Sequence, residues 1–165
     1  MVVKTIVVRK SCGPKGPCRF DPDHEHDMIK KKYIYLDDIR TPVDVENWVV
    51  VRNYDEFTAQ VTLIGIENIE LISLDHDLGE TAMKEYFNNV APNYELDYGN
   101  IVEKTGYDCA KWLVSKSMQT KIPLPQIYVH SANPIGAANI MGYVNNYLMN
   151  CGLPQTCIRV KINHT

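Results

Sequence analysis

Adjacent carboxylates follow one apolar run of this chain, and an acidic residue recurs after another run. Asp37 and Asp38 come directly after residues 33–36, and Asp75 comes directly after residues 71–74. Carboxylate oxygens are the ligands that hard divalent cations such as Mg²⁺ prefer. The first pair therefore predicts a cation site, although a solvated turn would carry the same residues. The recurrence at Asp75 favours the cation site.

His76 stands between two carboxylates in the second acidic motif. Asp75 and Asp77 would face the same side if the strand continues through them, because side chains alternate along a strand. Carboxylates beside a histidine stabilise its charged form, so His76 could act as a general acid or orient a phosphate. The alternative is a structural pair between His76 and one of the two aspartates.

A third group of polar residues follows the apolar run 127–129. His130, Ser131 and Asn133 precede the expected start of a helix, whose backbone N–H groups could help these side chains to bind a phosphate. Ser131 or Asn133 could also be simply the N-cap of that helix. Both roles are compatible with one residue.

Two basic residues stand where they could contact an anionic ligand. Arg40 follows the first acidic pair, so it either binds an anion or only neutralises Asp38. Lys161 follows the apolar run 157–160 and could supply a second cation, but an exposed lysine at a strand end is the favoured interpretation.

These polar groups share one position, because each follows an apolar run with the length of a strand. In open parallel α/β sheets, ligands bind beyond the carboxyl ends of the strands. The predicted strands are 33–36, 48–51, 70–75, 126–129 and 156–162, and the predicted helices are 54–64, 107–118 and 134–148. This alternation predicts an α/β fold with a mostly parallel, five-stranded sheet and helices on both faces.

Two connections depart from that simple pattern. The nine residues 39–47 are few for a parallel crossover, which usually needs about a dozen or more. Either a degenerate helical turn bridges these strands or their boundaries lie elsewhere. Residues 80–104 form a long, irregular connection with several aromatic residues, where roughly 2–6 residues are usual. They are predicted to be an insertion, either a lid over the site or a disordered segment.

The first 32 residues differ in character from the rest and are predicted to be an extension, with an extra strand at 2–8 and a loop. Two cysteines and two histidines there allow a zinc site as a disfavoured alternative, because their spacing does not match common structural zinc motifs. These residues are Cys12, Cys18, His24 and His26. Residues 33–165 are predicted to form the main domain.

Composition limits the possible partners and locations. A net charge of −3 gives no general attraction for nucleic acid, so no extended surface for a duplex is expected. No apolar run reaches the roughly 18 residues of a membrane helix. Five cysteines are an odd number for a disulfide framework and fit a reducing compartment. We therefore expect a cytoplasmic protein, in the host cytoplasm if it is of viral origin.

The order of acidic, hydroxyl and basic residues resembles the receiver domains of two-component response regulators. The matching residues are Asp37, Asp38, Asp75, Gly106, Ser131 and Lys161. This resemblance implies a flavodoxin-like sheet in which Asp37, Asp38 and Asp75 hold Mg²⁺. The chain differs from ordinary receivers in three ways: the first crossover helix is missing, the insertion is present, and the residue after Lys161 is not proline.

The chain is more similar to a receiver-like family proposed to process cyclic phosphates. Four motifs carry this resemblance in order, LDDIRTP at 36–42, SLDHDLG at 73–79, TGYD at 105–108 and VHSANP at 129–134. The resemblance implies hydrolysis of a cyclic phosphate ester, in a small nucleotide or at an RNA end. The cofactor would be Mg²⁺ or Mn²⁺.

The implied mechanism gives each polar residue a role. Asp37, Asp38 and Asp75 would hold the cation, while His76 and His130 would share the acid and base work. Asp77 would orient His76 or serve as an outer metal ligand. The phosphate would be held by Arg40, Ser131 and Asn133. Two alternatives remain, a binding module for a phosphorylated or cyclic ligand and a receiver phosphorylated on Asp75.

Overall fold

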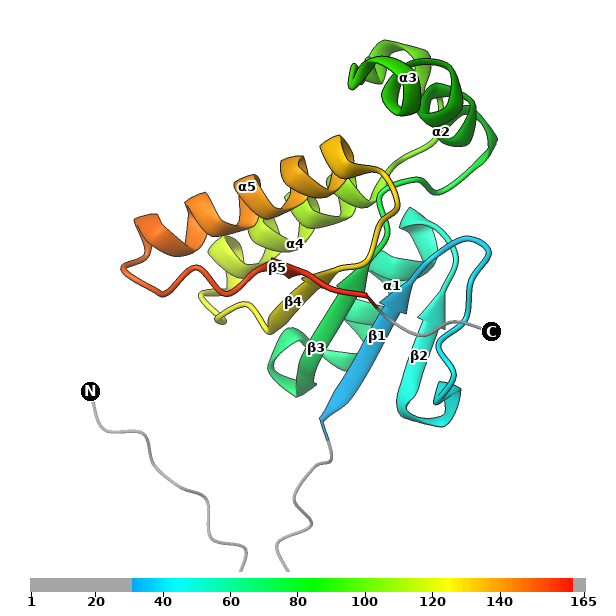
Figure 1. Cartoon of the computed structure of the whole chain (residues 1–165). Coiled ribbons are helices and arrows are strands. Elements are labelled where there is room, and N and C mark those ends of the chain that lie inside the picture. The colour runs from blue at the N-terminus through cyan, green and yellow to red at the C-terminus, as the bar shows by residue number, and fades with distance from the viewer. Residues whose placement is uncertain (1–30, 162–165) are drawn as a thin grey trace, which may run out of the picture.

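The computed structural model describes residues 31–161 and has a five-stranded parallel sheet at its centre (Figure 1). The strands are β1 (Lys32–Leu36), β2 (Trp48–Val51), β3 (Ile69–Leu74), β4 (Gln126–Val129) and β5 (Ile158–Arg159). Their order in the sheet is β2-β1-β3-β4-β5, which confirms the predicted fold class. The first four strands lie within one residue of their predicted bounds, whereas β5 is much shorter than predicted.

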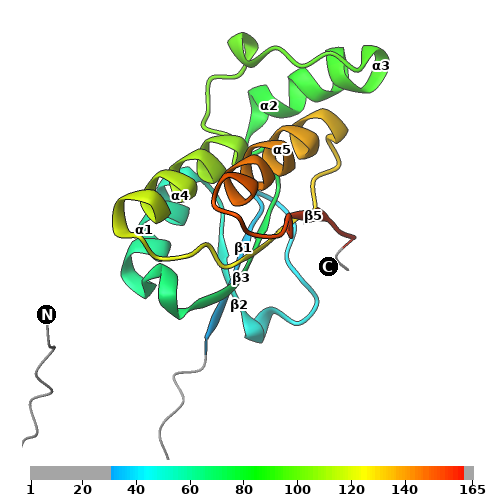
Figure 2. The same cartoon turned by 90° about the vertical axis from the view of Figure 1, so that its left-hand side faces the viewer.

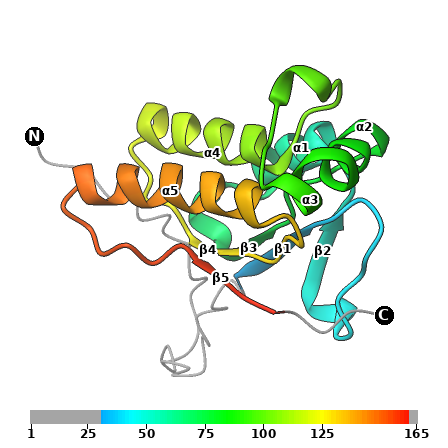
Figure 3. The same ribbon diagram turned by 45° about the horizontal axis from the view of Figure 1, so that its top comes forward.

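Three long helices, α1 (Tyr54–Ile64), α4 (Gly106–Thr120) and α5 (Pro134–Asn150), lie on one face of the sheet (Figure 3). The handedness of the crossovers explains this placement. The connections β2 to β3, β3 to β4 and β4 to β5 all advance in one direction along the sheet, and right-handed crossovers then put their helices on the same face. We predicted helices on both faces, but within residues 31–161 the long helices cover one face only.

The connection from β1 to β2 runs in the opposite direction and would place its helix on the second face. It contains only the 3₁₀ turn η1 (Val45–Asn47), so the degenerate helical turn is the alternative that the structure confirms. On this second face, Trp48 packs against the rings of Tyr33 and Tyr35, with centroid distances of 5.5 and 5.7 Å.

The apolar core lies between the sheet and the three long helices. Side chains alternate along a strand, so every second residue of the central strands faces the helices. These core residues are Ile34, Leu36, Ile72, Leu74, Ile127 and Val129, all at most 2% exposed. Burying each such side chain contributes about 1.5–3 kcal/mol to the free energy of unfolding. The alternate residues Tyr35 and Ser73 point to the second face, on the side that continues into Asp37 and Asp75.

The insertion, residues 80–104, is helical rather than irregular. It consists of α2 (Glu80–Glu85), the π-helical turn η3 (Tyr86–Val90) and α3 (Ala91–Asn93), followed by the 3₁₀ turn η4 (Tyr98–Asn100). It projects beyond the carboxyl ends of the central strands (Figures 1 and 2). The π turn and the proline in α3 interrupt the 3.6-residue period, which explains why the sequence pattern did not indicate a helix there.

Two buried or half-buried carboxylates hold the insertion together. Glu85 is 3% exposed and accepts hydrogen bonds from the backbone N–H of Asp97 and from the side-chain amides of Asn89 and Asn100, at 2.8–2.9 Å. Glu103 accepts hydrogen bonds from the first turn of α2, including the Ala82 N–H at 2.9 Å. The insertion is thus a folded unit that presents a defined surface to the sheet edge.

Helix α4 begins very close to the end of β3. Gly106 donates its N–H to the carbonyl oxygen of His76 at 2.9 Å, and a Cβ at this position would lie 1.8 Å from the carbonyl oxygen of Asp75. Only glycine fits this approach. Thr105 and Asp108 form a capping box at the same helix start. The TGYD motif therefore fixes the backbone that carries Asp75.

Several predictions concern residues beyond the part of the chain that the structure describes. The strand at 2–8 and the alternative zinc site at Cys12, Cys18, His24 and His26 lie outside residues 31–161. Within the described residues, no helix has both the length and the apolar character needed to cross a membrane.

Candidate functional site

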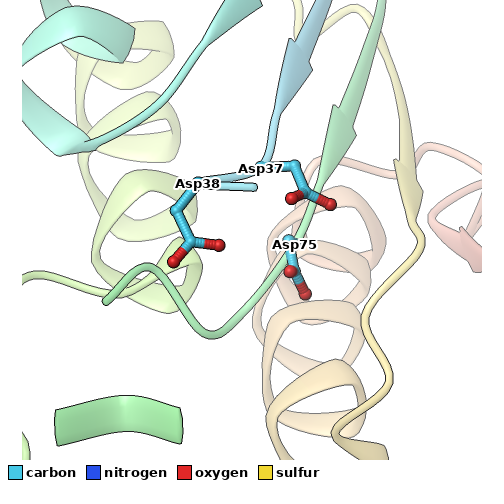
Figure 4. A group of neighbouring side chains, drawn as sticks. All are labelled: Asp37, Asp38 and Asp75. Atoms are coloured by element: carbon cyan, nitrogen blue, oxygen red, sulfur yellow. The ribbon is translucent and has the colours of Figure 1, made fainter. Parts of the chain in front are cut away.

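Three carboxylates meet at the carboxyl edge of the sheet. Asp37 and Asp38 follow β1 and Asp75 follows β3, and one oxygen from each lies within 4.8 Å of the others (Figure 4). The Asp75 N–H donates to the carbonyl oxygen of Leu36 at 2.9 Å, so the two strand ends are in register. The pairing of neighbouring parallel strands therefore creates this acidic cluster, and we keep that name for these three residues.

Arg40 is the positive side chain that contacts the acidic cluster. Its Nε and Nη2 atoms each lie 2.7 Å from a carboxylate oxygen, Oδ2 of Asp37 and Oδ2 of Asp75 respectively. Arg40 thus pairs with these two aspartates, and the alternative pairing with Asp38 does not occur. The Arg40 backbone N–H also donates to Oδ1 of Asp37 at 2.6 Å, which fixes the turn after β1.

The two adjacent aspartates have opposite electrostatic environments. Burial would raise the pKa of Asp37, but hydrogen bonds from His130 and from the backbone of Arg40 and Ile39, with the Arg40 charge, lower it to about 2. Burial and the charges of Asp37 and Asp75 raise the pKa of Asp38 to about 6. One guanidinium therefore does not compensate the charge of three carboxylates.

His130 lies behind the acidic cluster, on the second face of the sheet. Its ring stacks on Tyr35 with a centroid distance of 4.4 Å and an interplanar angle of 16°. Its Nδ1 lies 2.7 Å from Ser73 Oγ, and its Nε2 lies 3.3 Å from Oδ2 of Asp37. The side chain has no exposed surface. His130 therefore contacts the cluster through Asp37.

His76 occupies a separate buried position beneath the insertion. Its Nδ1 lies 2.6 Å from Oδ1 of Asp77, and its Nε2 lies 3.1 Å from the Tyr98 hydroxyl. The Asn139 amide donates to the same hydroxyl at 3.0 Å. The His76 ring is fully buried against α5, where a Cβ on Gly136 would lie 2.2 Å from it. The insertion and α5 thus fix the His76 ring from two sides.

The VHSANP motif forms the start of α5. Asn133 is the N-cap, because its Oδ1 accepts the Gly136 N–H at 2.8 Å. Its Nδ2 donates to Oδ1 of Asp77 at 3.2 Å, and Ser131 Oγ accepts the Asn133 N–H at 3.2 Å. Ser131 and Asn133 are both buried, so the capping role is formed and it links α5 to the second acidic motif.

A cleft of about 300 Å³ opens beside the acidic cluster. It is lined by Asp37, Asp38, Ile39, Arg40, Asp75, Asp77, Met83, Tyr86 and Ala132. Five of the predicted site residues therefore reach it, the four aspartates and Arg40. The other four do not line it, namely His76, His130, Ser131 and Asn133. Met83 and Tyr86 belong to the insertion, so the insertion forms one wall of the cleft.

Several residues that support the site were not predicted from the sequence. Arg52 donates to the carbonyl oxygens of Asp37 and Arg40 at 2.8 and 2.7 Å and to Thr41 Oγ1 at 2.8 Å, which holds the loop after β1. No local pattern marks Arg52. Ser73 could have been found, because it stands two residues before Asp75 and therefore on the same side of the strand.

In the last strand, the basic side chain that supports the site is Arg159 rather than the candidate Lys161. Lys161 is exposed and forms no ion pair within residues 31–161. Arg159 instead donates to the carbonyl oxygens of Ser131 and Ala132, at 2.8 and 3.2 Å. The strand-end lysine is therefore exposed, as favoured, and Arg159 holds the loop that leads into α5.

The sheet order and the acidic cluster at its carboxyl edge define a receiver-like protein. Comparison with family models identifies the family, because residues 32–146 match the one described as the Cyclic-phosphate processing Receiver domain. The chain belongs to this family. Searches of curated proteins and of solved structures found no match.

The acidic cluster fits a divalent cation of the kind that receivers bind. It offers three hard oxygen donors within 4.8 Å of one another. Burial, together with the charges of Asp37 and Asp75, raises the pKa of Asp38, and the single guanidinium of Arg40 leaves the three ionised carboxylates with a net negative charge. A small dication with mixed carboxylate and water ligands would match both the donor set and the charge.

Proposed function

We propose that this protein is a metal-dependent phosphoesterase that opens a cyclic phosphate, in a nucleotide or at an RNA end. The observation that carries the proposal is the acidic cluster at the floor of a cleft, in a chain of the cyclic-phosphate processing family. Asp37, Asp38 and Asp75 would hold Mg²⁺ or Mn²⁺. When bound, such an ion polarises phosphoryl oxygens and lowers the pKa of water.

The reaction needs groups that hold the phosphate and move protons. Water adds to phosphorus, one ester P–O bond breaks, and the released oxygen takes up a proton, so no oxidant or second substrate is required. Arg40 is placed to bind a phosphoryl oxygen because it lines the cleft. Asp77 also lines the cleft and hydrogen-bonds to His76 and to Asn133, which makes it the predicted group through which His76 would act.

His130, Ser131 and Asn133 keep supporting roles in this proposal. His130 contacts Oδ2 of Asp37, and Asn133 contacts Asp77, so each would act on the phosphate through a carboxylate that reaches the cleft. Ser131 would fix the loop before α5 through its hydrogen bond from the Asn133 backbone. The buried histidines are thus acid–base candidates by relay rather than by direct contact.

The apolar and aromatic part of the cleft lining supports an organic substrate rather than inorganic phosphate alone. Ile39, Met83, Tyr86 and Ala132 contribute this part of the cleft lining. Aromatic and methionine side chains bind flat, apolar groups such as nucleobases by stacking and dispersion. A ligand with a phosphate at one end and a base at the other would match both the charged and the apolar parts of this lining.

A binding module that captures the same ligand without turnover is the second candidate. The observation that favours it is the complete burial of both histidine rings, which puts the two acid–base candidates out of direct reach of a ligand. Phosphorylation of Asp75 has weaker support, because Oδ1 and Oδ2 of Asp75 already accept hydrogen bonds at 2.7 Å from the His76 N–H and from Arg40.

The test is a turnover assay on a panel of cyclic phosphates. The full chain would be incubated with 2′,3′-cyclic nucleotides, cyclic dinucleotides and RNA ending in a cyclic phosphate, each with Mg²⁺, with Mn²⁺ or with a chelator. We expect metal-dependent ring opening that Asp75→Asn abolishes and that Glu80→Gln, an exposed carboxylate outside the cleft, leaves unchanged.

Two other outcomes separate the alternatives. Thermal stabilisation by a cyclic nucleotide that persists in chelator, without product, would identify a binding module. An added phosphoryl group in the intact mass after treatment with a small phosphodonor would identify a phosphoacceptor. Absence of ring opening across the whole panel excludes the catalytic proposal.

A further inference from the structure

Arg40 occupies the part of the acidic cluster where a cation would bind. Its guanidinium lies between two neighbouring strand ends and contacts one oxygen from each, Oδ2 of Asp37 and Oδ2 of Asp75, both at 2.7 Å. Figure 4 shows the carboxylates of these two residues beside each other. The guanidinium therefore serves as the cation of the cluster in this structure.

The other oxygens of the same carboxylates are committed to the backbone. Asp37 Oδ1 accepts the N–H groups of Ile39 and Arg40, at 3.0 and 2.6 Å. Asp75 Oδ1 accepts the His76 N–H at 2.7 Å. These bonds orient both carboxylates without help from the guanidinium. The Oδ2 atoms accept no backbone N–H, so they are the oxygens that remain for a metal ion, and Arg40 contacts both at 2.7 Å. Oδ2 of Asp37 also lies 3.3 Å from His130 Nε2 and 3.4 Å from the Tyr35 hydroxyl, on the second face of the sheet.

The position of Asp38 indicates that Arg40 alone does not neutralise the negative charge of the acidic cluster. Its side chain forms no ion pair within residues 31–161, and its carboxylate lies close to those of Asp37 and Asp75. A dication would bring the missing charge, but a dication and a guanidinium on the same two oxygens would repel each other across a few ångströms. The geometry favours one or the other at Oδ2.

The Arg40 side chain also has room to move away from Asp37 and Asp75. Its side chain is 31% exposed and lines the cleft, whereas Asp37 and Asp75 are almost completely buried. A rotation of the Arg40 side chain would move the guanidinium away from the floor and into the cleft. There its planar set of donors would match the oxygens of a phosphate.

We propose that Arg40 and a divalent cation exchange at the two Oδ2 atoms, so that metal binding converts Arg40 from a partner of the cluster into the phosphate ligand. This inference rests on the metal site of the proposed function. It explains how one arginine can contact the carboxylates in this structure and still bind substrate. It also makes phosphate binding by Arg40 dependent on the metal.

The test compares Mn²⁺ binding by the full chain and by Arg40→Gln, with the free Mn²⁺ signal in electron paramagnetic resonance as the readout. We expect Arg40→Gln to bind Mn²⁺ about ten-fold more tightly or better, because the competing guanidinium is gone. Lys84→Gln is the matched control, since it removes one positive charge from an exposed position that does not line the cleft. It should leave Mn²⁺ affinity unchanged.

A second measurement separates exchange from a merely structural role. Inorganic phosphate binding would be followed by calorimetry at saturating Mn²⁺, where we expect Arg40→Gln to bind phosphate more weakly than the wild type. The variant thus gains metal affinity and loses phosphate affinity, whereas a folding defect lowers both. Arg40→Lys, which keeps the charge without the forked donors, should lie between the two for phosphate.

The outcomes distinguish this inference from the proposed function. Unchanged or weaker Mn²⁺ binding by Arg40→Gln overturns the exchange, even if cyclic phosphates are opened. The absence of Mn²⁺ binding by both proteins overturns it as well. Opposite shifts in metal and phosphate affinity would support the exchange even if no cyclic phosphate were turned over.

Discussion

Asp38 differs from the other two carboxylates of the acidic cluster because no positive side chain within residues 31–161 pairs with it. Asp37 and Asp75 each have an Arg40 contact and a backbone N–H. Asp38 instead faces their negative charge while half-buried, and its pKa rises from the usual 3.8 to about 6. Without a metal ion, the charged form of Asp38 therefore destabilises the fold.

We predict that Asp38→Asn stabilises the metal-free protein near pH 8 by about 1 kcal/mol, a figure reduced for solvent screening of a half-exposed group. Because the folded pKa of Asp38 is raised, the folded state binds the extra proton between about pH 4 and pH 6, and the cost of the charge is complete above that window. Urea unfolding in chelator would measure the effect. The gain should vanish near pH 4, and an equal gain at both pH values would contradict this explanation.

At the scale of elements, α5 contains two glycines with different surroundings. A Cβ on Gly136 would lie 2.2 Å from the His76 ring, whereas a Cβ on Gly142 would meet nothing within 4 Å. The first glycine is needed for the close approach of α5 to the second acidic motif. The second only weakens the helix.

We therefore expect opposite effects from the same substitution in one helix. Gly136→Ala should lower the free energy of unfolding by about 1–3 kcal/mol or more, because the buried His76 ring cannot move aside. Gly142→Ala should raise it by about 0.5–1 kcal/mol through helix propensity. Denaturant unfolding of both variants checks the pair. Equal tolerance of both would show that the packing of α5 against His76 is looser than described.

The insertion is the element that shapes the cleft beyond the acidic cluster. Its first helical turns bring Met83 and Tyr86 to the cleft, and its later part brings Tyr98 to the His76 ring. The hydrogen bonds of Glu85 hold these two parts together. A rigid insertion can therefore influence both ligand contact and the position of His76.

Tyr86→Ala is expected to weaken the binding of 2′,3′-cyclic nucleotides by roughly 5- to 100-fold, the usual range for the loss of one aromatic stacking contact with a base. Tyr94→Ala is the matched control, because Tyr94 belongs to the same insertion, is 71% exposed and does not line the cleft. Calorimetric titration would compare the two variants. Equal losses in both would exclude a specific contact between Tyr86 and the base.

At the scale of the whole molecule, the site depends on two adjacent strands that are brought together by the sheet order. Arg40 and Asp75 are 35 residues apart in the chain, yet they form an ion pair at 2.7 Å. The sheet therefore joins the halves of the acidic cluster only when it is folded. A cation that binds all three carboxylates binds the native state in preference to the unfolded chain.

Mn²⁺ should consequently raise the thermal midpoint of the full chain. At a free concentration of 100 times the dissociation constant, the stabilisation amounts to about 2.7 kcal/mol. Addition of a chelator should reverse it, and Asp37→Asn should remove it. Differential scanning calorimetry would measure these shifts. A midpoint that does not respond to Mn²⁺ in the wild type would contradict metal binding at the acidic cluster.

Local patterns in the sequence were sufficient to predict the first four strands, the long helices and the carboxylates at the strand ends. The first two strands have nearly their predicted bounds, and the predicted helix 54–64 is α1 itself. Apolar periodicity and the polar residues that follow each strand are properties of a few consecutive residues, so they can be recognised without knowledge of the fold. The acidic cluster follows from them once the strands are taken as parallel neighbours.

The tertiary structure decided which of these polar residues reach the cleft. His76 and His130 follow strands as the aspartates do, but Tyr98 and Gly136 enclose the first ring and Tyr35 stacks on the second. It also brought Met83 and Tyr86 to the cleft and joined Arg40 to two aspartates. These arrangements depend on crossover handedness and on contacts between distant elements, which no short stretch of sequence encodes.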